Sequence, residues 1–282
     1  MFYAPENEIE LIESLKLADD KTYIIAGGTD LIIKLKNRKI IDYSIIDISK
    51  MQSWNYLTED DDNYYIGPLI TMTELCDNDT VKEKLPAIYW AAKELGSTQI
   101  RNKATIGGNI SNASQSADTL LSLYAYDAKI KIINSLGEEK IVGIEDFVVG
   151  REKTILNLGE AVKEIIIKKK DRISTFKKVG SRKAVTISKV SCAVELLKKD
   201  ELVGNIRVFL GAVGIKPVRA ELLEAEFSGK KLSDVSLDRL REAAFNEVEK
   251  AIPTRDSRFY KRVAIEGLIE EVLGDLMRYE KL

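Results

Sequence analysis

The sequence predicts an α+β protein in two parts, in which two small α/β subdomains are followed by a small sheet with helices. Three observations predict this organisation. Strand-like apolar runs alternate with amphipathic helical runs through residues 1–170, which is typical of α/β units. A charged connector at 168–172 interrupts that pattern and marks a domain boundary near residue 170. Beyond it, three strand-like runs precede two long helical runs.

The first subdomain is expected at about residues 1–55 and the second at 56–170. In the first, acidic residues early and Lys16 late in an amphipathic run favour a helix. The elements expected there form a β–turn–α–β unit: a helix at 6–17, a strand at 22–26, a helical turn at 30–36 and a strand at 44–48.

The second subdomain is expected to open with a hairpin, because the acidic run at 59–63 precedes an apolar strand. Pro86 suits the first turn of a helix, which Gly96 would end. The polar, glycine-containing stretch from Gly96 to Asn112 is expected to be a long loop. The remaining elements expected are a helix at 118–128, a strand around Ile130 and Ile132, and a turn at 134–137.

The C-terminal part, residues 171–282, is expected to hold strands at 175–179, 190–197 and 206–213, and helices at 236–251 and 256–278. The last helix carries apolar residues on a helical spacing, which predicts that they pack in a core. These residues are Phe259, Val263, Ile269, Val272 and Leu276.

Composition excludes several classes of function. The 282 residues carry 43 basic and 45 acidic side chains, a net charge of −2, so binding to nucleic acid is not expected. No window approaches 18 uncharged apolar residues, so no membrane insertion is expected. The first residues show no basic leader followed by an apolar stretch, and we expect a cytoplasmic protein.

The absence of histidine limits the chemistry most strongly. With no His and two cysteines, the chain has no Ser–His–Asp triad, no His–zinc site and no cysteine cluster. Cys192 stands in an apolar run and is expected to be buried. No residue is assigned as catalytic and none as a metal ligand. A bound cofactor is therefore expected to supply any reactive group.

Two glycine pairs are the candidate binding motifs. Gly27-Gly28 directly follows a strand, and Gly107-Gly108 stands in the expected polar loop. Paired glycines permit positive φ and close approach, so that successive N–H groups can converge on an anion such as a diphosphate. Each pair could instead be only a tight turn. Neither is a GxGxxG fingerprint or a P-loop. Asp118 could be a helix N-cap, or its carboxylate could accept hydrogen bonds from ribose or ribityl hydroxyls.

Several motifs together resemble a known family. They are AGGTDL at 26–31, QIRNKATIGGNISNAS at 99–114, ADTLLSL at 117–123, KVGSRKAVTIS at 178–188 and GAVGIKPVRA at 211–220. Over essentially its whole length, the chain resembles the FAD-binding medium subunit of molybdenum hydroxylases, a group that includes bacterial xanthine dehydrogenase and aerobic carbon monoxide dehydrogenase. The resemblance implies an FAD-binding region of PCMH type (1–170) and a C-terminal domain of CO dehydrogenase flavoprotein type (171–282), with an antiparallel sheet.

The resemblance also implies which residues bind FAD. Two segments would surround the diphosphate, and Asp118 would bind cofactor hydroxyls. Val162 would line the pocket, although Leu or Ile is more usual there. Lys178 would lie at the flavin. Without the resemblance, it would be interpreted as a surface lysine on a strand. The full set is Ile24, Ile25, Ala26, Gly27, Gly28, Thr29, Asp30, Leu31, Thr105, Ile106, Gly107, Gly108, Asn109, Asn112, Asp118, Val162, Lys178 and Ile187, the last near the isoalloxazine ring.

The function implied is electron transfer within an oxidoreductase. A large partner subunit would carry molybdopterin and a small one [2Fe–2S] clusters, and electrons would pass through noncovalent FAD here to NAD⁺ or another acceptor. Two alternatives remain open. One is a free-standing FAD oxidase or dehydrogenase of related fold. The other is a non-enzymatic ligand-binding module in which the glycines only form turns.

Overall fold

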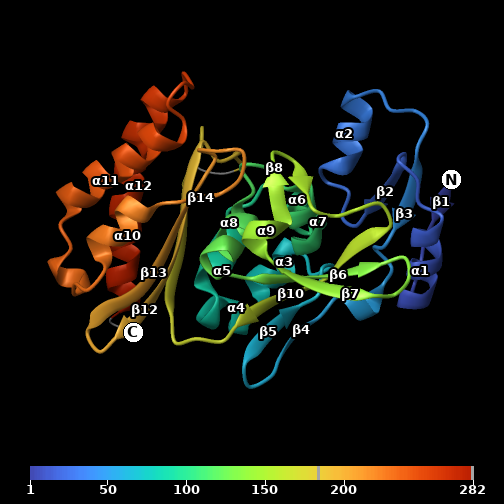
Figure 1. The fold of residues 1–282 in the computed structure, drawn as a ribbon, viewed down its shortest axis with the longest axis horizontal. Helices are drawn as coiled ribbons and strands as arrows, with labels where there is room; N and C mark the ends of the chain where they lie inside the picture. Colours follow the sequence, from blue (N-terminus) through green and yellow to red (C-terminus); the bar gives the residue numbers. More distant parts are fainter. Residues whose placement is uncertain (183–184, 281–282) are drawn as a thin grey trace. The chain divides into compact units, whose positions relative to one another are not determined.

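The computed structural model describes residues 1–182 and 185–280. Lys183 and Ala184 of the motif at 178–188, and the last two residues of the predicted C-terminal domain, lie outside the described residues. The chain divides into two compact units, which we describe separately (Figure 1). Unit 1 comprises Met1–Glu74, Thr98–Ala113 and Asp127–Lys169, and unit 2 comprises Leu75–Ser97, Ser114–Tyr126 and Lys170–Leu282.

Unit 1 begins with a parallel three-stranded sheet of order β1-β3-β2 and one helix packed against it. The helix α1 starts where the Asn7 side chain accepts a hydrogen bond from the Glu10 N–H, and its Leu11 and Leu15 are buried. The predicted elements of this region are confirmed within two residues, and a short strand that was not predicted, β1, is present in addition. Their bounds are β1 Phe2–Tyr3, α1 Glu8–Lys16, β2 Thr22–Ile25, α2 Leu31–Asn37 and β3 Ser44–Asp47.

A second sheet of unit 1 is antiparallel and has the strand order β4-β5-β10-β6-β7. The predicted hairpin at 59–63 and the strand around Ile130 are confirmed. The central strand β10 was not predicted. The bounds are β4 Leu57–Glu59, β5 Asn63–Ile66, β6 Lys129–Asn134, β7 Glu139–Gly143 and β10 Glu160–Lys168.

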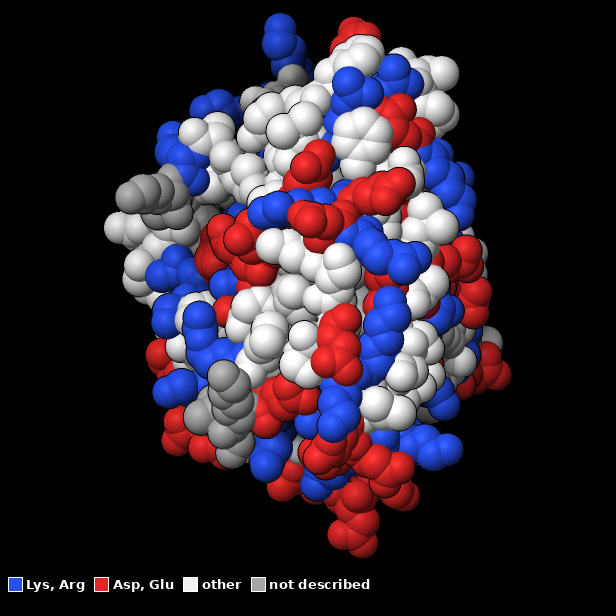
Figure 2. Space-filling model, turned by 90° about the vertical axis from the view of Figure 1, so that its left-hand side faces the viewer, with Lys and Arg blue, Asp and Glu red and all other residues white. Residues whose placement is uncertain are grey.

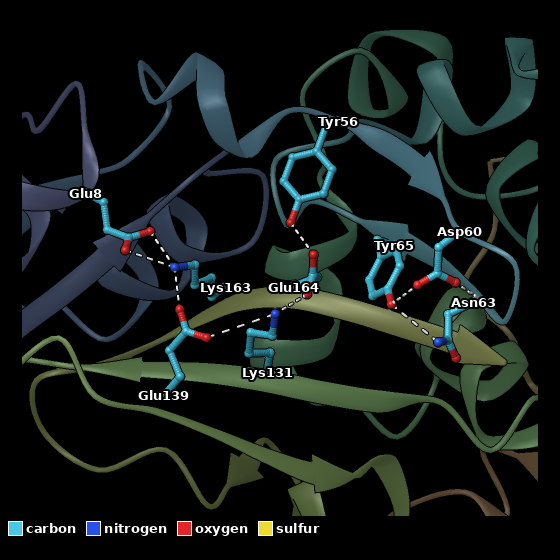
Figure 3. A network of polar contacts seen from close by, with 9 residues as sticks. All are labelled: Glu8, Tyr56, Asp60, Asn63, Tyr65, Lys131, Glu139, Lys163 and Glu164. Atoms are coloured by element: carbon cyan, nitrogen blue, oxygen red, sulfur yellow. Dashed lines mark hydrogen bonds and ion pairs between the residues drawn. The ribbon is translucent and has the colours of Figure 1, made fainter.

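A polar network ties this sheet to α1 (Figure 3). On β10, the buried Glu164 accepts a hydrogen bond of 2.6 Å from the Tyr56 hydroxyl and pairs with Lys131 at 2.6 Å. Its neighbour Lys163 pairs with Glu8 of α1 at 2.7 Å and with Glu139 of β7 at 2.5 Å. These contacts connect α1 to the sheet within unit 1 through charges that range from the buried Glu164 to the exposed Glu139.

The stretch from Gly96 to Asn112 is not the long loop that its composition predicts. It contains two short helices, α6 (Thr98–Arg101) and α7 (Ile106–Asn112). The second glycine pair lies in the first turn of α7, which begins because Thr105 caps it and because Ile106 and Ile110 are fully buried. Tertiary packing therefore overrides the low helix propensity of the glycines.

Unit 2 is built on an antiparallel sheet of order β11-β12-β13-β14. Alternate residues of β12, Cys192 among them, share one core with the C-terminal helices α10, α11 and α12. The helices α5 and α8 contact strands of the same sheet. The bounds are α5 Pro86–Lys93, α8 Asp118–Ala125, β11 Ile173–Val179, β12 Val190–Lys199, β13 Leu202–Gly211, β14 Val218–Arg219, α10 Glu221–Phe227, α11 Leu237–Ala251 and α12 Arg258–Tyr279.

The expected core stripe of the last helix is only half correct. Ile269, Val272 and Leu276 are fully buried, but Phe259 and Val263 are 55% and 61% exposed. The reason is geometric: an α-helix turns by about 100° per residue, so the six steps from 263 to 269 lead to a different face. On the side of unit 2 covered by these helices, acidic and basic side chains are interspersed (Figure 2). Ion pairs such as Arg241–Glu270 at 2.7 Å join them.

The remaining elements are short. They are α3 Met72–Asp77, α4 Asp79–Lys84, α9 Ile144–Phe147, β8 Val148–Gly150, β9 Lys153–Thr154 and the 3₁₀ turns Gln52–Trp54 and Leu232–Asp234. Pro86 does open α5, although that helix ends at Lys93, three residues before Gly96. Across the described part of the chain, every helix is too short or too polar to cross a membrane.

Candidate functional site

The first glycine loop of unit 1 joins β2 to α2, and both glycines are required by its geometry. A Cβ on Gly27 would lie 1.7 Å from the carbonyl oxygen of Lys103, so no larger residue fits there without moving the backbone. Gly28 has a φ of +70°, which L side chains rarely adopt. The turn therefore brings the chain from the strand to α2 in a conformation that only glycines allow.

This loop presents unused hydrogen-bond donors. Within residues 1–182 and 185–280, the N–H groups of Gly27, Gly28, Thr29 and Asp30 donate no hydrogen bond. All but Asp30 are half-buried. Backbone N–H groups in such a place need an acceptor, and a row of them suits an anion. The loop thus fits the diphosphate of a dinucleotide cofactor.

The second glycine pair differs from the first in how its N–H groups are used. Those of Ile106 and Gly107 donate to the carbonyls of Ile70 and Pro68, at 3.0 and 2.9 Å. The N–H of Gly108 donates to Thr105 Oγ1 at 3.1 Å. Neither glycine of this pair has positive φ, so the expected conformational reason for glycine holds only at Gly28.

The two glycines of α7 have different surroundings. A Cβ on Gly107 would lie 2.5 Å from the Pro68 Cβ, so this glycine allows close packing of the chain on itself. Gly108 is exposed, and a Cβ there would meet only Thr105 Oγ1, at 3.0 Å. A ligand can therefore approach the backbone at Gly108 but not at Gly107.

Asn112, at the end of α7, connects the two glycine segments. Its Nδ2 donates to the Asp30 carboxylate at 3.2 Å, and its Oδ1 accepts from the Lys34 ammonium at 2.5 Å. Unit 1 thus brings together the predicted residues at 24–31 and at 105–112. Lys34 was not predicted, and nothing local indicates its partners, Asn112 and Glu152.

Asp118 and Lys178 form a buried ion pair in unit 2. The Lys178 Nζ lies 2.7 Å from Asp118 Oδ2, and the Ser188 hydroxyl donates to Asp118 Oδ1 at 2.6 Å. Asp118 is not the N-cap of α8, which is Ala117. Burial raises the pKa of the Asp118 carboxyl, while the ammonium and the two hydrogen bonds oppose that shift.

Lys178 is not a surface lysine, because its side chain is only 5% exposed. It also donates to the carbonyl oxygens of Glu94 at 2.8 Å and Thr186 at 3.4 Å. The three donors of the ammonium are therefore all used. Ser188 was missed by the sequence interpretation although it ends the motif at 178–188, since nothing local indicates that its hydroxyl faces Asp118.

Two further residues that were predicted to bind FAD, Val162 and Ile187, lie in different surroundings. Val162 is a buried residue of β10 in unit 1, where it pairs with Ile132 of β6. Ile187 of unit 2 is 78% exposed. The structure therefore gathers the residues at 24–31, 105–109 and 112 in unit 1, and it joins Asp118 and Lys178 in unit 2.

Comparison with known proteins identifies the class of the chain, which is that of FAD-binding flavoproteins. Residues 1–169 match the family described as the FAD binding domain in molybdopterin dehydrogenase. Residues 174–276 match the CO dehydrogenase flavoprotein C-terminal domain. The chain belongs to this molybdopterin dehydrogenase family, as an FAD subunit of oxidoreductases of the molybdenum hydroxylase type.

Individual relatives agree along nearly their whole length. The glyceraldehyde dehydrogenase medium chain of Sulfolobus acidocaldarius is 31% identical, over 94% of this chain and 96% of the relative. The nicotinate dehydrogenase FAD-subunit of Eubacterium barkeri is 28% identical, over 98% and 95%. A structure of carbon monoxide dehydrogenase from Hydrogenophaga pseudoflava superposes with a TM-score of 0.87 at 25% identity, covering 98% of this chain and 96% of that one. The predicted family, fold class and FAD cofactor are confirmed.

Proposed function

We propose that this chain is the electron-transfer subunit of a multisubunit molybdenum hydroxylase. It would take electrons from [2Fe–2S] clusters on a small partner subunit, while a large partner subunit holds molybdopterin and oxidises the substrate. When bound here, FAD supplies a group that accepts such electrons and can reduce NAD⁺ or another acceptor. Support comes from relatives named medium chains or FAD-subunits of dehydrogenases.

The observation that carries the proposal is the row of N–H groups from Gly27 to Asp30 that donate to no acceptor in the part of the chain that the structure describes. A diphosphate has acceptor oxygens and negative charge, and it would complete those hydrogen bonds. The open side of Gly108 would let the cofactor approach α7. Thr105, Ile106, Asn109 and Asn112 would complete the surroundings of the diphosphate.

We propose noncovalent binding for the same cofactor. Covalent attachment of flavins commonly uses His or Cys, and the chain has no His. Cys192 is buried in the core of unit 2, so its thiol is inaccessible to a ligand. We also propose that flavin binding involves Asp118, Val162, Lys178 and Ile187.

The same proposal extends to domains and location. The FAD-binding domain would comprise residues 1–170, with subdomains at about 1–55 and 56–170, and the C-terminal domain residues 171–282. We also propose a cytoplasmic location. No residue of this chain needs to act as an acid or base on the organic substrate, since the substrate would be oxidised on the large partner subunit.

The experiment is affinity purification of the tagged chain from its native host, followed by identification of co-purifying chains. We expect a molybdopterin-containing chain and an iron–sulfur chain, and a complex in which substrate reduces the flavin. NADH should reduce the flavin of the isolated chain, which alone should oxidise no N-heterocycle. Substrate oxidation by the isolated chain would show instead a free-standing flavoprotein.

A further inference from the structure

A charged network lies beside the first glycine loop in unit 1. The Lys34 ammonium is placed between Asn112 Oδ1, at 2.5 Å, and the Glu152 carboxylate, at 3.2 Å. Asn112 in turn holds the carboxylate of Asp30, which ends the row of unused donors. The side chains of Lys34 and Glu152 are 28% and 34% exposed, so solvent screens their attraction only in part.

The backbone holds Glu152 in an unfavourable conformation. It lies in the turn between β8 and β9 with a φ of 53°, and Ala113 at the C-cap of α7 has a φ of 45°. The Glu152 N–H donates to the Ala113 carbonyl at 3.0 Å, so the two residues are bonded to each other. Non-glycine residues with positive φ are uncommon, and such strained positions cluster at functional sites.

A diphosphate beside Asp30 would be repelled by that carboxylate. Asn112 holds the Asp30 carboxylate by its amide nitrogen, and its amide oxygen accepts from the Lys34 ammonium, so that the amide connects the carboxylate to a cation. Glu152 fixes the ammonium from the other side. The amide of Asn112 is thereby oriented, since its oxygen faces a cation and its nitrogen faces an anion.

We propose that Lys34 and Glu152 are positioning residues for the FAD diphosphate, which act through Asn112 and Asp30 on the donors at 27–30. This inference rests on the proposed function, because it assumes that FAD binds at the loop. It adds two residues that the family resemblance did not supply. Neither needs to touch the cofactor.

The test uses the full chain and measures its affinity for FAD and for riboflavin, which has no diphosphate. Lys34→Met should weaken FAD binding about tenfold, the effect of one charge-assisted hydrogen bond, and leave riboflavin binding unchanged. Lys34→Arg keeps the positive charge, so this variant should retain most of the wild-type affinity for FAD. Lys36→Met is the matched control, since Lys36 is an exposed residue of the same helix with no ion pair among the described residues.

Glu152→Gly separates positioning from a structural role. Glycine tolerates the φ of 53°, so a residue needed only for the turn should be replaced with no loss of thermal stability and no change in FAD affinity. If Glu152 is a positioning residue, the Glu152→Gly variant should have equal or higher thermal stability, but it should bind FAD about tenfold more weakly. Glu152→Gly and Lys34→Met together should weaken FAD binding no more than either alone.

The outcomes distinguish this inference from the proposed function. If the wild-type chain binds no FAD, the proposed function fails and this inference fails with it. If the wild type binds FAD but Lys34→Met and Glu152→Gly bind it equally well, only the positioning role is wrong. Equal losses for FAD and riboflavin would also contradict it, because the diphosphate would then not be the part affected.

Discussion

The ammonium of Lys178 lies 2.7 Å from the carboxylate of Asp118, and both side chains are almost completely buried in unit 2. A buried ion pair gains little over an apolar pair of similar size, but loss of one partner leaves the other charge without compensation. Here the Lys178 ammonium also holds two backbone carbonyls, and Asp118 also accepts from Ser188. The pair should therefore be necessary for the fold of unit 2 as well as for any contact with flavin.

The first prediction concerns this pair. Lys178→Met should lower the free energy of unfolding by about 3–5 kcal/mol, because a buried carboxylate loses its partner. The double variant Asp118→Asn, Lys178→Met should recover most of that loss, since no buried charge remains. Urea unfolding of the apo chain measures both. A loss below about 1 kcal/mol for the single variant would show that the pair is solvated.

The two exposed or half-buried glycines of the site should respond differently to alanine. Gly27→Ala places a Cβ against the Lys103 carbonyl, so both stability and FAD binding should fall. Gly108→Ala meets only Thr105 Oγ1, so the fold should be kept and FAD binding alone should weaken. Circular dichroism and flavin fluorescence separate the two effects. Undiminished FAD binding by Gly108→Ala would remove α7 from the site.

Thiol chemistry gives a third prediction. Burial raises the pKa of the Cys192 thiol to about 12, so at pH 8 only about one thiol in ten thousand is ionised. In the native chain a thiol reagent should react with Cys76, which is half-buried, and should reach Cys192 only after unfolding. Cys76→Ser should abolish the native reaction. Rapid labelling of that variant would place Cys192 outside the core.

The fourth prediction is a pH dependence of stability. The hydrogen bond from Lys163 holds the pKa of Glu139 below its ordinary value of 4.5. The stabilisation is therefore present above about pH 4.5 and is lost as the pH falls through the lower, folded-state pKa. Glu139→Gln should remove that part of the acid-induced loss. Parallel pH profiles for variant and wild type would contradict the assignment.

The elements that could be predicted from the sequence are those in which apolar residues recur at a regular spacing. β2 and β3 are short apolar runs that end at glycines or polar residues, and α11 is a long amphipathic helix. β10 was missed because a bulge between Val162 and Glu164 breaks the alternation of buried and exposed residues. α7 was missed because its glycine pair indicates a loop.

The candidate site could be predicted only in its outline. The two glycine pairs are alike in sequence, yet among the described residues only the first has N–H groups that donate no hydrogen bond. In the second pair, the N–H of Gly107 donates to the carbonyl of Pro68, which lies far away in the chain, and that of Gly108 donates to the hydroxyl of Thr105. Nothing local indicates the Pro68 partner, although Thr105 is a local signal for a helix N-cap. The burial of Lys178 likewise depends on Asp118, sixty residues earlier.

The central claim is that this chain binds FAD noncovalently at the glycine loops, and one measurement tests it most directly. The purified chain is loaded with FAD, its flavin content is determined, and it is then denatured with acid and centrifuged. We expect one FAD per chain, all of it released into the supernatant, and a Gly108→Ala variant that retains less. A chain that binds no FAD, or flavin that stays with the precipitated protein, would contradict the account.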